Sequence, residues 1–155
     1  MSDYQEHEYV DLGLPSGTLW ATCNVGADMP EKYGDYYSWD EGKKAAANWG
    51  DGWCMPSEEQ WEELMRNTKS IWTTRNGLNG RLFTALNGKS LFLPAAGYRW
   101  HDNLHGAGSY GDYWSSSLDT SRPNLAWYFG FYSGYCYVGG RNRCRGRSVR
   151  AVREN

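Results

Sequence analysis

The stretch Leu125-Ala-Trp-Tyr-Phe-Gly-Phe-Tyr132 predicts the strand around which this chain folds. Its aromatic residues favour β-structure, in which successive side chains point to opposite faces of a sheet. One face is uniformly apolar and consists of Leu125, Trp127, Phe129 and Phe131. The other face is mixed and consists of Ala126, Tyr128, Gly130 and Tyr132. We therefore expect the apolar face to belong to the core and the mixed face to point outward.

Residues 109–153, which surround this strand, are drawn from a narrow set of amino acids. They include no Lys, Glu, Gln or Met, although the first 108 residues contain 19 of these. Glu and Lys are ordinarily common, so at the same rate the segment should hold about eight of the four types. Every residue present except Trp114 and Trp127 can be encoded by a codon that ends in a pyrimidine. Randomising the adenines of Asn codons would leave this set, so we interpret the segment as diversified in sequence.

The same composition suits a binding surface. Tyr offers large, rigid contact area, while Ser, Gly and Asn offer adaptable hydrogen bonds, as in antibody paratopes. Arg adds a planar group with several donors. The alternative is an ordinary β segment whose composition follows strand propensity. Strand propensity explains the Tyr residues but neither the many Arg residues nor the missing Lys and Glu, so we favour the binding surface.

A helix is predicted upstream by a local capping signal. Ser57-Glu-Glu-Gln60 is a capping box, in which the Ser hydroxyl and the Gln side chain each bind the other residue's amide. Trp61, Leu64 and Met65 then recur at helical spacing and predict the stripe that faces the core. We expect this helix to begin at Ser57 and to end near Asn67.

Several short strands complete the expected fold. Asn87-Gly88 predicts a type I′ turn between strands at residues 81–86 and 89–93. Further strands are expected at residues 9–13, 18–25, 112–117 and 147–153, and a long loop is expected over residues 26–52. The chain has room for one domain, over residues 1–155. We therefore expect an α+β fold with short strands, one clear helix and long loops.

The charge distribution argues against some partners. Residues 1–108 carry nine Lys or Arg against 15 Asp or Glu, whereas residues 109–155 carry seven Arg against three acidic residues. A nucleic-acid surface is normally more strongly basic and contains Lys, so we expect no nucleic-acid partner. No apolar run reaches membrane-spanning length and no signal peptide is visible, so we expect no membrane insertion.

Cysteine and histidine patterns give no clear site. The spacing of the four cysteines matches neither a zinc pair nor a dense disulfide framework, which favours free thiols. His101 and His105, with Asp102 between them, have a spacing compatible with one metal ion, but a third ligand is not evident. We therefore expect no metal, no cofactor and no catalytic residue.

Five segments carry a resemblance to a known family. They are Tyr9-Val-Asp-Leu-Gly-Leu-Pro-Ser-Gly-Thr-Leu-Trp-Ala-Thr-Cys-Asn-Val-Gly-Ala27, Trp53-Cys-Met-Pro-Ser-Glu-Glu-Gln-Trp61, Leu93-Pro-Ala-Ala-Gly-Tyr-Arg99, Tyr113-Trp-Ser-Ser-Ser117 and Ser148-Val-Arg-Ala-Val-Arg153. Through them the chain resembles the variable proteins of diversity-generating retroelements, in particular those of gut Bacteroidetes and their phages. The resemblance implies a C-type lectin-like fold of the formylglycine-generating-enzyme type.

The resemblance also implies that the C-terminal part contains two kinds of residue, scaffold residues and variable ligand-binding residues. The variable ligand-binding region would lie at about residues 110–145. The implied scaffold residues are Trp114, Ser115, Ser116, Phe129, Phe131, Val149 and Val152. The implied variable, ligand-binding residues are Asp112, Asp119, Arg122, Asn124, Tyr128, Gly130, Tyr132, Tyr135, Tyr137, Arg141, Asn142 and Arg143.

The function expected from these features is binding without catalysis. The ligand would be a protein or a glycan on another cell or particle, and the protein would belong to a phage virion or a bacterial surface. One alternative is a surface or adhesin domain of the same fold without diversification. Another is an oxidase related to formylglycine-generating enzymes, with Cys136 and Cys144 as its thiol pair.

Overall fold

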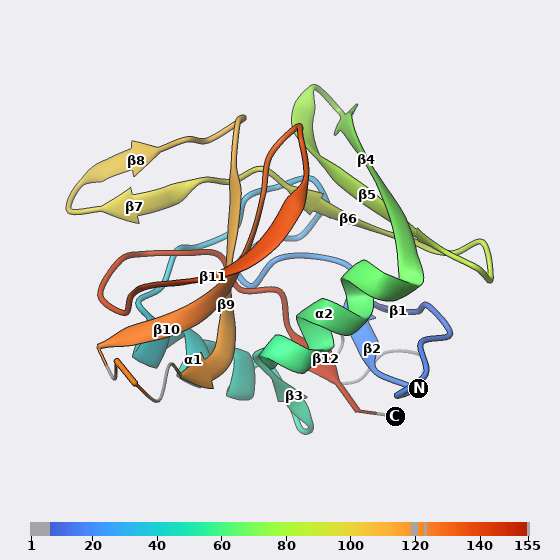
Figure 1. Ribbon diagram of the computed structural model, residues 1–155, viewed down its shortest axis with the longest axis horizontal. Coiled ribbons are helices and arrows are strands. Elements are labelled where there is room, and N and C mark those ends of the chain that lie inside the picture. Colours follow the sequence, from blue (N-terminus) through green and yellow to red (C-terminus); the bar gives the residue numbers. More distant parts are fainter. Residues whose placement is uncertain (1–6, 119–120, 123, 155) are drawn as a thin grey trace.

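The structure is dominated by β-strands. The computed structural model describes residues 7–118, 121–122 and 124–154 (Figure 1). Within these ranges the chain forms twelve strands in four small sheets and two helices, and strands account for 45% and helices for 13% of the structure. The expected α+β, C-type lectin-like fold is therefore wrong, and the fold is a small β-rich one. The difference arises because segments without a clear hydrophobic alternation, such as residues 136–142, form strands through hairpin pairing.

The first sheet joins the beginning and the end of the described chain. Its strands, in spatial order, are β1 (Tyr9–Asp11), β2 (Leu19–Ala21), β12 (Val152–Arg153) and β3 (Trp53–Cys54). The two strands predicted at residues 9–13 and 18–25 are confirmed as the shorter antiparallel pair β1 and β2. The strand predicted over residues 147–153 is shorter than expected, because only its last two residues enter the sheet.

The predicted helix is confirmed as α2 (Glu58–Asn67), with both hydrogen bonds of its capping box. Trp61 and Leu64 are buried, and Met65 packs against the same core cluster. A second helix, α1 (Trp39–Ala47), lies where a loop was expected and has Ser38 as its N-cap. Among the described residues, no helix is both long enough and apolar enough to cross a membrane.

Two successive hairpins form a three-stranded sheet from β4 (Thr68–Arg75), β5 (Leu78–Ala85) and β6 (Ser90–Pro94). The predicted pairing across Asn87-Gly88 is confirmed, but the type I′ turn is not: of these two residues only Gly88 has a positive φ, 86°. The type I′ geometry occurs instead at Asn76-Gly77, where φ is 50° and 80°.

The sheet that carries the predicted binding region lies near the middle of the molecule (Figure 1). It has the order β11 (Cys136–Asn142), β10 (Leu125–Phe131) and β9 (Gly111–Leu118), all antiparallel. The strands predicted at residues 112–117 and 125–132 are thereby confirmed. A separate two-stranded ribbon, β7 (Tyr98–Trp100) and β8 (Asn103–His105), projects beside β9.

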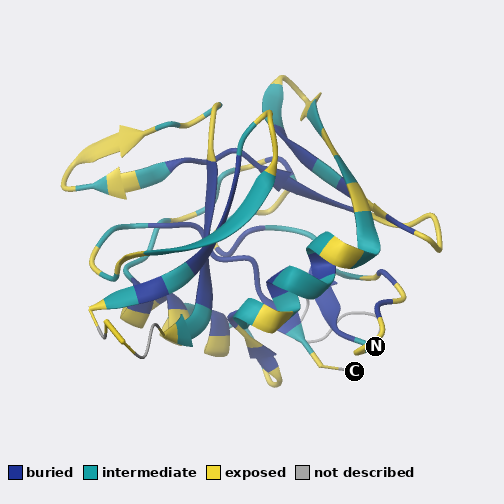
Figure 2. Ribbon diagram, viewed as in Figure 1, coloured by how far each residue is buried: buried dark blue, intermediate teal, exposed yellow. Residues whose placement is uncertain are grey.

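Both faces of this sheet are covered, and Figure 2 shows β9 and most of β10 as buried. On the predicted apolar face, Phe129 stacks on Trp61 of α2 with ring centroids 4.5 Å apart. On the opposite face, Ala126 and Tyr128 belong to a second core cluster together with Trp114. The expectation that the mixed face points outward is therefore wrong at Ala126, Tyr128 and Gly130, because the segment after β11 folds back beside it. The expectation that the whole apolar face belongs to the core is wrong at Leu125 and Trp127, which are only half-buried beside the register shift between β9 and β10.

An arginine on β5 joins two sheets. Arg81 is buried, and its Nη1 donates hydrogen bonds to the carbonyl oxygens of Tyr132 and Ser133, at 2.8 and 3.4 Å. Its Nε and Nη2 donate to the hydroxyl and the carbonyl oxygen of Ser70 on β4. Arg81 therefore fixes the turn between β10 and β11 to the β4–β5 hairpin.

Candidate functional site

A small pocket opens between β7 and the mixed face of the β9–β10–β11 sheet, with a volume of about 240 Å³. Four tyrosines line it: Tyr98, Tyr110, Tyr128 and Tyr137. Four charged residues complete the lining: Asp112, Arg141, Arg145 and Arg147. We refer to these eight residues as the Tyr/Arg pocket. It contains four of the predicted ligand-binding residues and brings them together with residues from outside the predicted set.

The backbone beneath the pocket is held from both sides. Arg147 exchanges two backbone hydrogen bonds with Tyr37, at 2.8 and 2.9 Å, and Gly146 exchanges two with Arg99, at 2.9 and 2.7 Å. The amide of Ser148 donates to the carbonyl oxygen of Asp112 on β9. These bonds fix the position from which the Arg147 side chain enters the pocket.

The guanidinium of Arg147 is the most deeply buried charge of the pocket, at 1% exposure. It lies over the rings of Tyr98, Trp114 and Tyr128, with its central carbon 4.8–5.3 Å from their centroids. Its Nε is 3.7 Å from a carboxylate oxygen of Asp112, which is too long for a hydrogen bond. Among the described residues, Nε and Nη1 have no hydrogen-bond acceptor.

Burial weakens the charged state of both members of this pair. Burial raises the pKa of Asp112, and the neighbouring Arg147 and Arg141 oppose this shift without cancelling it. Burial likewise lowers the pKa of Arg147, and the Asp112 carboxylate opposes that shift. Both shifts indicate that desolvation exceeds the mutual attraction, as expected for a buried pair without a direct hydrogen bond.

Arg141 and Arg145 form the sides of the pocket. The Arg141 guanidinium lies over Tyr128 at 5.2 Å, and that of Arg145 lies over Trp100 at 4.6 Å and over Tyr98 at 5.7 Å. Arg141 is exposed at the end of β11, whereas Arg145 is half-buried and its Nε has no acceptor among the described residues. The guanidinium groups of Arg141 and Arg145 therefore both rest on aromatic rings and both line the pocket.

Two glycines make room for the pocket's rings. Gly139 lies opposite Tyr128 across the β10–β11 pair, and Gly130 lies opposite Tyr137. A Cβ on Gly130 would come within 2.6 Å of the Tyr137 ring, and one on Gly139 within 3.1 Å of the Tyr128 ring. With these rings seated over glycines, the hydroxyls of Tyr128 and Tyr137 approach to 3.3 Å.

Tyrosine rings continue from the pocket to the tip of the β10–β11 hairpin. The sequence of neighbouring rings is Tyr128, Tyr137, Tyr135, Tyr132 and Tyr110, with successive centroids 4.8–6.3 Å apart. Tyr135 and Tyr110 are the most exposed, at 56% and 48%. We call the Tyr/Arg pocket together with Tyr132 and Tyr135 the Tyr/Arg face.

The structure places the predicted ligand-binding residues in two groups. The first group belongs to the Tyr/Arg face or, in the case of Gly130, lies against one of its rings: Asp112, Tyr128, Gly130, Tyr132, Tyr135, Tyr137 and Arg141. The second lies at the far end of the same sheet, near α1: Arg122, Asn124, Asn142 and Arg143. Asp112, Tyr128 and Gly130 are buried, and Asp119 lies outside the described residues.

Arg143 is tied to the scaffold. Its Nη2 donates to a carboxylate oxygen of Asp40 at 2.7 Å, and its guanidinium lies over the Trp39 ring at 4.5 Å. Its amide also donates to the carbonyl oxygen of Asn124, which closes this end of the sheet. Arg122, Asn124 and Asn142 are exposed beside it.

The residues predicted as scaffold are nearly all buried. Six of them are inaccessible to solvent: Trp114, Ser115, Phe129, Phe131, Val149 and Val152. Ser116 is half-buried. The indole of Trp114 donates to the carbonyl oxygen of Tyr37, and the indole of Trp39 donates to that of Ser115. These bonds position β9 and therefore the Asp112 side of the pocket.

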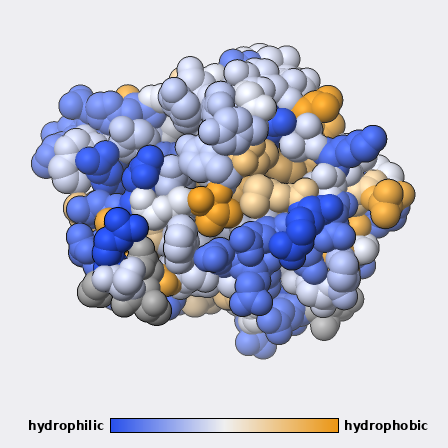
Figure 3. Space-filling model, in the orientation of Figure 1, coloured by the Kyte–Doolittle hydropathy of each residue, from blue (hydrophilic) through white to orange (hydrophobic). Residues whose placement is uncertain are grey.

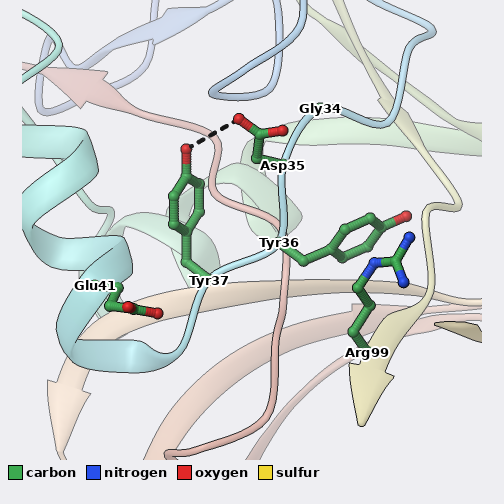
Figure 4. A pocket seen from close by; sticks show the side chains of 6 residues that line it. All are labelled: Gly34, Asp35, Tyr36, Tyr37, Glu41 and Arg99. Carbon is green, nitrogen blue, oxygen red and sulfur yellow. Dashed lines mark hydrogen bonds between the residues drawn. The ribbon is translucent and has the colours of Figure 1, made fainter. Parts of the chain in front are cut away.

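Larger hollows exist, but they lack such buried donors. One of them, of about 540 Å³, is lined by Asp35, Tyr36, Tyr37, Glu41 and Arg99 among others. Figure 4 shows the Tyr37 hydroxyl donating to Asp35 and the Arg99 guanidinium resting on Tyr36. Its acidic and basic groups are exposed and satisfied by neighbours or solvent, so we favour the Tyr/Arg pocket as the site.

A different face carries apolar side chains. Figure 3 shows them gathered between α2 and the β4–β5 hairpin on an otherwise mainly polar surface. Partly buried apolar residues of α2, β4 and β11 pack against the first core cluster, among them Met65, Trp72 and Val138.

The two thiols of the oxidase alternative lie at opposite ends of β11. Cys136 begins the strand and Cys144 lies two residues beyond its end, so about 20 Å separates them at the usual rise per residue. A disulfide requires Cα atoms within about 7 Å. Burial also raises the pKa of the Cys136 thiol, which disfavours a reactive thiolate.

The histidine pair is divided by the β7–β8 turn. His105 stacks on Tyr98 with centroids 5.2 Å apart, and His101, in the turn with a φ of 56°, contacts Trp100. Asp102, between them, is exposed. Over the described ranges, no three His, Cys, Asp or Glu side chains gather as a metal site would require.

The named ligand-binding residues omit four members of the pocket: Tyr98, Tyr110, Arg145 and Arg147. Tyr110 and Arg145 lie at the two ends of the predicted binding region, residues 110–145, whereas Tyr98 and Arg147 lie outside it. Arg145 and Arg147 belong to the Arg-rich C-terminal segment, so the charge asymmetry could have indicated them. Tyr98 gives no such signal, because it reaches the pocket only through the pairing of Arg99 with Gly146.

Comparison with known proteins adds a family but no activity. A family model described as a domain of unknown function (DUF8237) matches residues 67–152, which include the whole Tyr/Arg face. No curated protein and no solved structure matches the chain. Because the match covers more than half of the sequence, the chain belongs to the DUF8237 family.

Proposed function

We propose that this chain is a non-enzymatic binding protein, of the kind that diversity-generating retroelements vary, and that its Tyr/Arg face contacts a protein or glycan on another cell or particle. One observation carries the proposal. The segment with the narrow amino-acid set, residues 109–153, supplies every member of the Tyr/Arg face except Tyr98. An unusual composition and a continuous surface thus coincide.

The physical character of this face supports binding. Rigid Tyr rings present area at a low cost in side-chain entropy, and hydroxyls at their edges exchange hydrogen bonds. Tyr110 and Tyr135 are about half exposed, whereas Phe129 and Phe131 beneath them are inaccessible. Side chains at the surface can therefore change while those below maintain the sheet. The protein would act at a phage or bacterial surface.

The encoding locus and sibling sequences test the diversification. We expect a near-identical template repeat that differs only at adenines, beside a reverse transcriptase gene. Siblings should differ at the half-buried Tyr132 and at the exposed Tyr135 and Arg141, and agree at the buried Phe129 and Phe131. Differences spread evenly along the chain, with no template repeat, would contradict the proposal and favour an undiversified surface or adhesin domain.

A further inference from the structure

We propose that the Tyr/Arg pocket binds a carboxylate group of the ligand, with Arg147 at its floor and Arg141 and Arg145 at its sides. This inference rests on the proposed function and names the chemistry of the ligand at that site. The observation that carries it is the state of Arg147, a buried guanidinium whose Nε and Nη1 lack acceptors among the described residues.

Buried donors without acceptors are costly. A donor left unsatisfied in a protein interior costs about 1–3 kcal/mol, and more when the group is charged. Asp112 does not remove this cost, because its closest approach to Nε is 3.7 Å. The Nε of Arg145 is in the same state. An acceptor that enters the pocket would meet the two arginines that carry these donors, because both line it.

The geometry of Arg147 favours a planar acceptor. Aromatic rings lie against the faces of its guanidinium, so its N–H groups remain available only in the plane of the group. A carboxylate accepts two parallel hydrogen bonds in such a plane. Rings of Tyr98 and Tyr128 would then flank the bound group.

Charge and size point to the same occupant. The pocket holds three arginines and one aspartate, so it presents an excess of positive charge. Its volume of about 240 Å³ is below the roughly 300–1,000 Å³ of sites for whole drug-sized ligands. The pocket therefore admits one anionic group of a larger ligand, whose remaining surface would lie on the tyrosines around it.

The experiment follows the arginine side-chain N–H signals by ¹H–¹⁵N NMR during titration at constant ionic strength. Sodium benzoate supplies a carboxylate on a ring, and benzamide is its neutral counterpart of similar shape. We expect benzoate to shift the Nε–H signals of Arg147 and Arg145 saturably, and benzamide to leave them in place. Inorganic sulfate and phosphate form separate arms and should bind more weakly than benzoate.

Substitution of the pocket sides tests the location without removing the buried Arg147. Arg141→Gln should weaken benzoate binding about threefold, as expected for a partly exposed charge. Arg145→Gln should weaken it about tenfold, because its guanidinium is half-buried. Arg66→Gln on α2 removes the same charge from an exposed position outside the pocket and should leave the affinity unchanged.

Three outcomes would overturn the inference. Equal binding of benzamide would show an aromatic pocket without anion recognition, and equal affinity in the Arg141→Gln, Arg145→Gln and Arg66→Gln variants would place the benzoate elsewhere. Stronger binding of sulfate or phosphate than of benzoate would refute the carboxylate assignment. None of these results bears on the template repeat or on sibling variation, so failure here is distinguishable from failure of the proposed function.

Discussion

At the scale of single residues, Asp112 and Arg147 determine the chemistry of the pocket. The Asp112 carboxylate is the one acidic group of the lining, and it lies beside the guanidinium that a ligand would need. It therefore competes with an incoming anion. Gly139 and Gly130, which lie under the rings of Tyr128 and Tyr137, affect the depth of the pocket and not its charge.

Acidification should strengthen anion binding. Because burial raises the pKa of Asp112, acidification protonates this carboxyl more readily than an exposed one and removes the negative charge that competes for Arg147. We expect sulfate affinity, measured by the same NMR signals, to increase as the pH is lowered from 7. Asp112→Asn should bind sulfate more tightly at pH 7 and lose this pH dependence, whereas a dependence that persists in the variant would contradict the mechanism.

His105 requires a control, because its imidazole stacks on Tyr98, which lines the pocket. His105→Gln should retain the pH dependence of sulfate binding.

The pKa shift of Asp112 also predicts the sign of its effect on protein stability. The pKa of Asp112 in the folded protein is raised above its value in the unfolded chain. The contribution of Asp112 to the free energy of unfolding therefore declines as the pH rises from the unfolded pKa through the folded pKa.

At the scale of elements, the sequence predicts those whose signals are local. The capping box at Ser57 identifies α2, and the alternation in residues 125–132 identifies β10. Helix α1 was missed although Ser38 and Glu41 have the same spacing as a capping box, because the surrounding residues show no strong apolar stripe. Strand β11 was missed because Gly139-Gly140 interrupts its alternation, and only its pairing with β10 makes it a strand.

A matched pair of glycine variants tests how tightly the central sheet is packed. A Cβ on Gly111 would overlap the buried ring of Phe131, its partner across β9 and β10, so Gly111→Ala should lower the free energy of unfolding by about 1–3 kcal/mol. A Cβ on Gly140 in β11 would lie 3.9 Å from Leu125 Cδ1, an ordinary van der Waals contact, so Gly140→Ala should change the free energy of unfolding by less than about 1 kcal/mol. Urea denaturation measures both, and equal effects would contradict this account of the packing.

At the scale of the whole molecule, the two halves of the chain share one interior. Trp61 of α2 stacks on Phe129 of β10, and β12 lies between β2 and β3. The candidate pocket depends on the same long-range pairing, since β7 meets the segment after β11. For this reason the sequence revealed the tyrosines and arginines of the binding segment but not which of them meet.

The family match begins at residue 67, but we expect the matched region not to fold alone. A fragment of residues 67–155 lacks Trp20 and Trp61, so it would expose the apolar face of β10. Circular dichroism during urea denaturation should show no cooperative transition for the fragment and a single one for the whole chain. A cooperative transition in the fragment would show that residues 67–155 form an independent folding unit.

The hydrogen bonds of Arg81 have a consequence for tolerance to mutation. They end on the carbonyl oxygens of residues 132 and 133, which every amino acid possesses. Exchanging the side chains at these two positions therefore removes no acceptor from Arg81. The anchoring of the hairpin tip therefore does not depend on the side chains at these two positions. Variants of the protein could present different tip residues on an unchanged backbone.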